Sequence, residues 1–138
     1  MKSIKYTLVF IFLIIFKVTL YSQSDKTAGS DTSLIELISN STEVDLSRKN
    51  LTEIPDYIYT NKNLYYLNLS NNSITEVSSK IENLNNLRVL DLTGNDIYYL
   101  PEELNKLKFL KELYLDYDDW HWNISQLKKL TRARIILK

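Results

Sequence analysis

The sequence predicts an α/β solenoid, in which units made of a short strand, a tight turn and a return segment stack side by side. One pattern is written twice, from Leu64 to Ile74 and from Leu87 to Ile97, with the same 23-residue offset at every matching position. Its apolar positions do not form one helical stripe. Leu67 and Leu69 are two residues apart, which places them on the same face of a strand. A fixed period of this kind is typical of stacked repeats rather than of one globular core.

The period continues in both directions along the chain. Projected at this period, the inward strand position is occupied by Val44, Leu67, Leu90, Leu113 and then Ile136. The partner position two residues later is occupied by Leu46, Leu69, Leu92, Leu115 and then Lys138. In the last strand either Ile135 or Ile136 faces inward, because a slip of one residue exchanges the two faces. These columns predict one apolar spine through about four units and a terminal stub.

Asn72 and Asn95 stand where the chain must turn away from the strand. An Asn amide carries donors and an acceptor, so it can satisfy the carbonyls of its own turn and the backbone of the neighbouring turn. We therefore predict a structural role for both residues. The return segments, such as residues 102–107 after Pro101, are compatible with short helical turns.

The apolar columns, the turn Asn, and Pro55 and Pro101 at one phase resemble the leucine-rich repeat family over roughly residues 41–138. The resemblance implies a right-handed solenoid with parallel strands on a concave face and short helical or irregular segments on the convex face. The end units depart from the pattern, since Lys49 replaces the turn Asn and Asn61 interrupts the last apolar column of the first unit. Such degenerate units are expected at the ends of a capped array.

Residues 1–22 are typical of a secretory signal peptide, because Lys2 and Lys5 precede an apolar run and Ser22 precedes Gln23. The apolar run is shorter than the span of about 20 residues that a membrane helix needs. We expect cleavage rather than a retained anchor, no stable membrane insertion afterwards, and a secreted, periplasmic or cell-envelope protein. The abundance of Lys, Asn, Ile and Tyr, together with a leader that ends in Ser22-Gln23, resembles an exported protein of a Bacteroidetes-type bacterium.

Residues 23–40 are expected to form a polar tether followed by a short capping helix that ends near Ile38. This helix would cover the open edge of the first strand. The predicted repeat domain then occupies residues 41–138.

Composition excludes several classes of function. The full chain has 17 basic and 17 acidic residues, and without three leader lysines 14 basic residues remain (17 − 3), which argues against a nucleic-acid binder. The chain has no cysteine for disulfides or thiolate zinc sites. With two glycines and no paired catalytic motif, we predict no enzyme activity, no cofactor and no metal site.

The side chains between the inward strand positions predict a binding surface on the concave face. The candidate residues are Glu43, Asp45, Tyr66, Asn68, Asp91, Glu112, Tyr114 and Asp116. Tyrosine rings beside carboxylates suit a protein or peptide partner with basic groups, and stacking of a carbohydrate on the rings is an alternative. The basic residues Lys128, Lys129, Arg132, Arg134 and Lys138 are interpreted either as a solvated surface or as a patch for an acidic partner.

We predict an exported, non-enzymatic protein that binds a protein or peptide. One alternative is a structural solenoid of the cell envelope without a specific ligand. A second alternative is a metal-dependent or hydrolytic enzyme centred on His121, which is flanked by Asp116, Asp118 and Asp119.

Overall fold

A computed structural model of the chain describes residue 36 and residues 38–117, 127–129 and 131–138. The predicted signal peptide, the tether and the His121 segment lie outside the described residues. The described residues belong to one compact unit, Ile35–Lys138. None of the helices described in it is long and apolar enough to cross a membrane.

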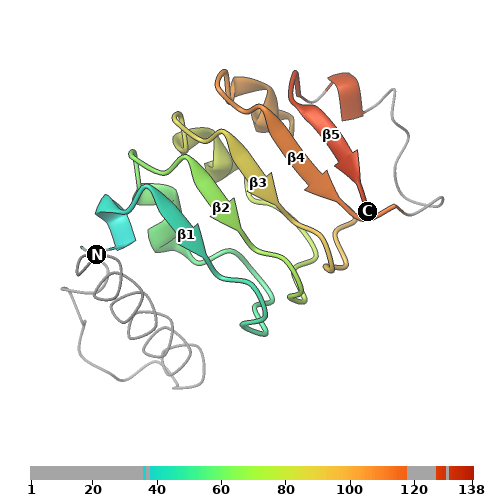
Figure 1. Cartoon of the computed structure of the whole chain (residues 1–138), viewed down its shortest axis with the longest axis horizontal. Helices are drawn as coiled ribbons and strands as arrows, with labels where there is room; N and C mark the ends of the chain where they lie inside the picture. Colours follow the sequence, from blue (N-terminus) through green and yellow to red (C-terminus); the bar gives the residue numbers. More distant parts are fainter. Residues whose placement is uncertain (1–35, 37, 118–126, 130) are drawn as a thin grey trace, which may run out of the picture. The chain divides into compact units, whose positions relative to one another are not determined.

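The described unit is built on one sheet of five parallel strands that follow one another in chain order (Figure 1). The strands are β1 (Glu43–Asp45), β2 (Tyr66–Asn68), β3 (Val89–Asp91), β4 (Glu112–Leu115) and β5 (Arg134–Leu137). Parallel neighbours require a crossover after each strand. Three of these crossovers contain the short 3-10 helices η1 (Asp56–Thr60), η2 (Ser79–Asn83) and η3 (Glu102–Lys106).

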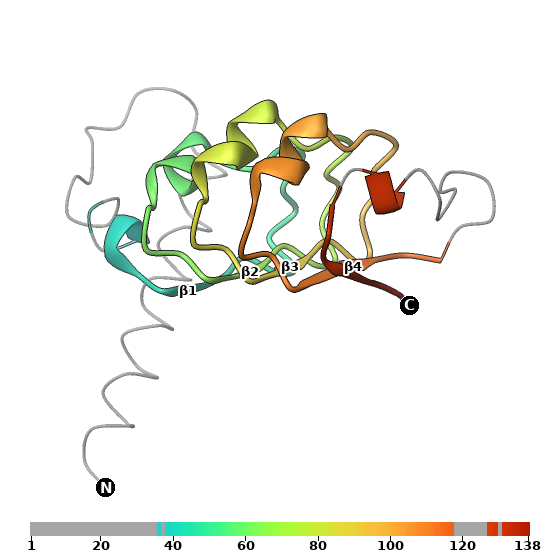
Figure 2. The same ribbon diagram turned by 90° about the horizontal axis from the view of Figure 1, so that it is seen from above.

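Figure 2 shows the sheet along one side of the unit and the helical turns along the other. Pro55, Ser78 and Pro101 precede the three 3-10 helices with extended backbones, and the Ser78 hydroxyl accepts a hydrogen bond from Lys80 N at 3.3 Å. Each position suits a residue that begins a helical turn. The predicted α/β repeat solenoid is confirmed.

A continuous apolar spine fills the space between the sheet and the helical turns. Leu67 pairs with Leu90, and Leu90 pairs with Leu113, on adjacent strands. All three side chains are 0% exposed. Burying one leucine contributes about 1.5–3 kcal/mol, so a single unit buries too little and the stack is the cooperative object.

The last strand departs from the 23-residue period. Ile135, not Ile136, pairs with Leu113, so this step is one residue shorter than the earlier ones. The projection that placed Ile136 and Lys138 at the inward positions is therefore wrong for β5. Leu127 is buried and lies one full period of 23 residues after the buried Leu104. The step is therefore shortened after Leu127.

At the other end, a buried polar residue joins the first repeat to a helical turn. Residues 36 and 38–40 are helical, and Ile38 is buried. The fully buried Asn61 donates from Nδ2 to the carbonyl oxygens of Ile38 and Ser41, both at 2.7 Å. Its Oδ1 accepts from Asn63 N at 2.9 Å. The residue that interrupts an apolar column in the sequence thus ties the chain entering β1 to the first unit.

Candidate functional site on the exposed face of the sheet

The strand register arranges the candidate side chains in two rows on the face opposite the spine, because alternate residues of a strand point to opposite faces. The first row is Glu43, Tyr66, Val89, Glu112 and Arg134, from β1 to β5. The second row is Asp45, Asn68, Asp91, Tyr114 and Ile136. Seven of the eight candidates lie in these rows, and Asp116 lies just beyond the end of β4.

The second row also serves the turns at the ends of the strands. In β1, β2 and β3 the last side chain accepts a hydrogen bond from the backbone N–H two residues later, which is an Asx turn. The pairs are Asp45 with Ser47, Asn68 with Ser70 and Asp91 with Thr93, at 2.9, 3.0 and 3.0 Å. These three candidates therefore have one side-chain oxygen committed to the backbone.

This turn role was missed by the sequence reasoning, although a signal was present. An Asp or Asn followed two residues later by Ser or Thr occurs at the same phase in three units. Such residues hydrogen-bond their own backbone and favour turns.

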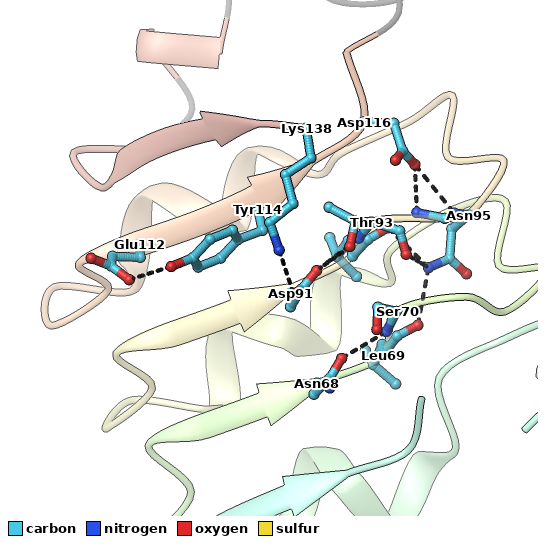
Figure 3. A network of polar contacts seen from close by, with 12 residues as sticks. Asn68, Leu69, Ser70, Asp91, Thr93, Asn95, Glu112, Tyr114, Asp116 and Lys138 are labelled. Atoms are coloured by element: carbon cyan, nitrogen blue, oxygen red, sulfur yellow. Dashed lines mark hydrogen bonds and ion pairs between the residues drawn. The ribbon is translucent and has the colours of Figure 1, made fainter. Parts of the chain in front are cut away.

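Asp116 supports the turn of the preceding repeat rather than pointing to a partner. Its Oδ2 accepts hydrogen bonds from Gly94 N at 2.7 Å and from Asn95 N at 3.3 Å (Figure 3). Gly94 has a φ of 69°, and a Cβ there would lie 2.9 Å from Asn71 Oδ1. Arg48 and Asn71 adopt the same left-handed conformation, so the close approach to Asn71 is what distinguishes the glycine position.

Asn72 binds two adjacent turns together. Its Oδ1 accepts from Lys49 N at 2.9 Å and from Leu51 N at 3.1 Å. Its Nδ2 donates to Leu46 O at 2.9 Å and to Leu69 O at 2.7 Å. The amide is buried, and every partner is backbone, so this side chain has no capacity left for a ligand.

Asn95 repeats the arrangement one unit later. Its Oδ1 accepts from Ile74 N at 3.0 Å, and its Nδ2 donates to Leu69 O at 3.0 Å and to Leu92 O at 2.9 Å. Both Asn residues therefore join their own turn to the repeat before it.

Basic residues of β5 and the chain end join the exposed face and neutralise its far end. Arg134 forms an ion pair with Glu112, whose other oxygen accepts from Tyr114 Oη at 2.8 Å. Lys138 Nζ lies 3.4 Å from Asp91 Oδ2 and 4.5 Å from the centre of the Tyr114 ring (Figure 3). We call these five residues the C-terminal network.

The pKa values of the network follow from these contacts. Hydrogen bonds from Tyr114 and Arg134 hold the pKa of Glu112 below its ordinary value. The hydrogen bond to Glu112 raises the pKa of Tyr114. Arg134 and Lys138 were not among the predicted site residues, because a strict 23-residue period places Ile136 and Lys138 on the buried face.

The opposite end of the face remains acidic. Among the residues that the structure describes, no cation forms an ion pair with Glu43 or Asp45. Tyr66 lies between the strands that carry these acids and Asp91. Burial raises the pKa of Tyr66 above its ordinary value, and the charges of Asp45, Asp91 and Glu43 add to the rise. We call Glu43, Asp45 and Tyr66 the acidic end.

The alternative site around His121 lies outside the described residues. Within the part of the chain that is described, no group of three or more His, Asp or Glu side chains is arranged to hold a metal ion.

Comparison with known proteins agrees with the repeat architecture. Residues 39–97 match the leucine rich repeat family. No curated protein matches the sequence. The fold is similar to a solved structure of a leucine-rich repeat protein from Leptospira interrogans, with a TM-score of 0.55 and 23% sequence identity. The match covers 82% of this chain and 35% of that one, so this chain spans about a third of the other protein's length.

An identity this low shows the fold alone. The family match over residues 39–97 agrees with the stacked parallel sheet of the described unit. The described unit therefore has a leucine-rich repeat fold.

Proposed function

We propose that this chain is an exported, non-enzymatic protein that binds a protein or peptide carrying basic groups at the acidic end of its exposed sheet face. The leucine-rich repeat fold is commonly used for protein–protein interaction, and its proteins are generally binding modules rather than enzymes. Solenoids present extended surfaces for this purpose. The single observation that carries the proposal is the position of Tyr66 among three carboxylates.

The chemistry of the acidic end suits a Lys or Arg side chain of a partner. Tyr66 offers a large contact area at low entropic cost, because a tyrosine has only two side-chain torsions. Glu43 and Asp45 add negative potential, which attracts a basic partner and selects against acidic ones. Asp45 keeps a second carboxylate oxygen beyond the one that its turn uses. The C-terminal network offers less, because its acids already face cations of the same chain.

A peptide selection tests the proposal. Residues 23–138 would be immobilised and used to select from a random peptide library, and the affinity of the selected peptides would be measured for Tyr66→Ala. We expect enrichment of Lys and Arg and an affinity loss of about tenfold or more, the scale of an interface hot spot. Tyr98→Ala is the matched control, because Tyr98 is also exposed but lies outside the two rows. Selected peptides without basic residues, or equal loss in both variants, would contradict the proposal.

A second candidate is a structural solenoid of the cell envelope without a specific ligand. The observation in its favour is that Asp45, Asn68, Asp91 and Asp116 all support turns. The same selection separates the two functions, because a purely structural face would enrich no peptide family.

Export is a separate part of the proposal and rests on the composition of residues 1–22. Mass spectrometry of the protein from its native cells would measure the mature N-terminus. We expect it at or near Gln23, in a secreted, periplasmic or envelope fraction. An intact Met1 terminus in the cytosolic fraction would contradict export.

A further inference from the structure

A second surface, distinct from the exposed sheet face, is formed by the segments that lead into β2, β3 and β4. These segments lie side by side at the ends of the strands where β2, β3 and β4 begin (Figure 1). They line an open depression of about 410 Å³. Its lining residues are Asn63, Tyr65, Asn86, Arg88 and Phe109, none of which belongs to the acidic end or to the C-terminal network.

The 23-residue period builds the depression from two columns of side chains. One column is Asn63, Asn86 and Phe109, and the other is Tyr65, Arg88 and Lys111. Arg88 N donates to Tyr65 O and Lys111 N donates to Arg88 O, both at 2.8 Å. Parallel segments bonded in this way are about 4.8 Å apart. The backbone therefore holds the lining residues at fixed spacing, which reduces the ordering that a ligand would impose.

The charge of the depression comes from Arg88. Its side chain is exposed and forms no hydrogen bond or ion pair with another described residue. Lys111 is exposed at the next position of the same column. Glu43 of the acidic end accepts a hydrogen bond from the Tyr65 hydroxyl. A planar guanidinium with its donors available matches a carboxylate, which it can bind through two parallel hydrogen bonds.

The remaining lining groups are two rings and two amides. Tyr65 is 36% exposed and Phe109 is 59% exposed, so both rings are accessible to a ligand. Asn86 is oriented by a hydrogen bond from Nδ2 to Lys62 O at 2.7 Å, which leaves its Oδ1 as an acceptor. Rings offer flat apolar contact, and amides offer donors and acceptors to hydroxyl groups.

We propose that this depression binds an acidic saccharide, that is, an oligosaccharide containing uronic acid units. The ring faces would contact the apolar faces of the sugar, the amides its hydroxyls, and Arg88 its carboxylate. The volume lies in the range of about 300–1,000 Å³ that is typical of small-ligand sites. The ligand charge is opposite to that expected at the acidic end, so the two sites take different partners.

Calorimetric titration of residues 23–138 with trigalacturonate tests the proposal. We expect binding that Arg88→Gln weakens about tenfold, as loss of a charge-assisted hydrogen-bonded pair does. Phe109→Ala should also weaken it, and this exposed side chain can be removed without disturbing the spine. Arg48→Gln is the control for charge, because Arg48 is exposed beyond the opposite end of β1. Circular dichroism would verify that every variant is folded.

Three outcomes would overturn the inference. They are no binding of trigalacturonate, equal binding by Arg88→Gln and the unchanged chain, or binding of triglutamate or maltotriose as tight as that of trigalacturonate. Tyr66→Ala separates this site from the proposed function, because it should weaken the binding of basic peptides about tenfold or more and leave trigalacturonate binding unchanged.

Discussion

The two ends of the exposed sheet face are built from the same repeat positions but differ in charge. Glu43 and Glu112 occupy the same row, on β1 and β4. Among the described residues, a cation forms an ion pair with Glu112 but none does with Glu43, because β5 places Arg134 beside Glu112. A repeat position therefore determines where a side chain lies, whereas the neighbouring strand decides whether its charge is available to a partner.

The largest expected effect is a loss of stability that affects both ends of the face together, because both ends pack on the same apolar spine. Leu90→Ala removes a fully buried side chain from the central strand and should lower the free energy of unfolding by about 2–5 kcal/mol. Urea denaturation monitored by circular dichroism measures the change. Val89→Ala, on the other face of the same strand, is the control and should have a much smaller effect. Equal effects of the two substitutions would mean that the spine does not carry the stability.

The next effect distinguishes two adjacent turns, the one after β2 and the one after β3. Asn72→Ala leaves several buried backbone groups without partners and should lower the free energy of unfolding by about 2–3 kcal/mol. Asn95→Ala should have a smaller effect, because Asn95 is partly exposed and water can replace some of its bonds. Chemical denaturation of the two variants provides the comparison. A larger loss for Asn95→Ala would contradict this ranking.

Removing the cations at the far end should make the two ends alike. In Arg134→Gln with Lys138→Gln, the acids of the C-terminal network lose their partners, and we expect basic peptides to bind there as well as at the acidic end. A second binding event in calorimetry, with an affinity within about tenfold of the first, would measure this gain. Lys80→Gln, which removes a cation among the helical turns, is the control. Unchanged stoichiometry would show that charge alone does not define the site.

The smallest effects are shifts in titration, which NMR can follow for single residues. Because the folded pKa of Glu112 is depressed, its contribution to stability is present above the unfolded pKa, ordinarily near 4.5, and is lost as pH falls through the folded pKa. Arg134→Gln should raise the pKa of Glu112.

The pKa of Tyr66 is shifted in the opposite direction from that of Glu112. Its pKa is raised above 10.0, so its contribution to stability is complete below that pH and is lost as pH rises through the folded pKa. Asp45→Asn should lower the pKa of Tyr66, whereas Glu112→Gln should leave it unchanged. A pKa of Tyr66 that is insensitive to Asp45→Asn would show that the acidic end does not act as one electrostatic unit.

Most of the fold was predictable because its cause is local and repeated. The spacing of Leu67, Leu90 and Leu113 identifies the spine, since each leucine meets the same environment one repeat later. The candidate rows followed from the alternation of side chains along each strand. The Asx turns at Asp45, Asn68 and Asp91 were also readable, but the sequence reasoning assigned these side chains to binding alone.

The sequence by itself determined the repeat, the buried columns and which side chains alternate with them, because a constant repeat period leaves few other ways to bury the leucines. Only the tertiary structure decided the register of β5, since Ile135 and Ile136 are equally apolar and pairing with β4 selects between them. That register places Arg134 and Lys138 beside Glu112 and Asp91. Contacts between residues so far apart along the chain set the charge of the face, and no local pattern encodes them.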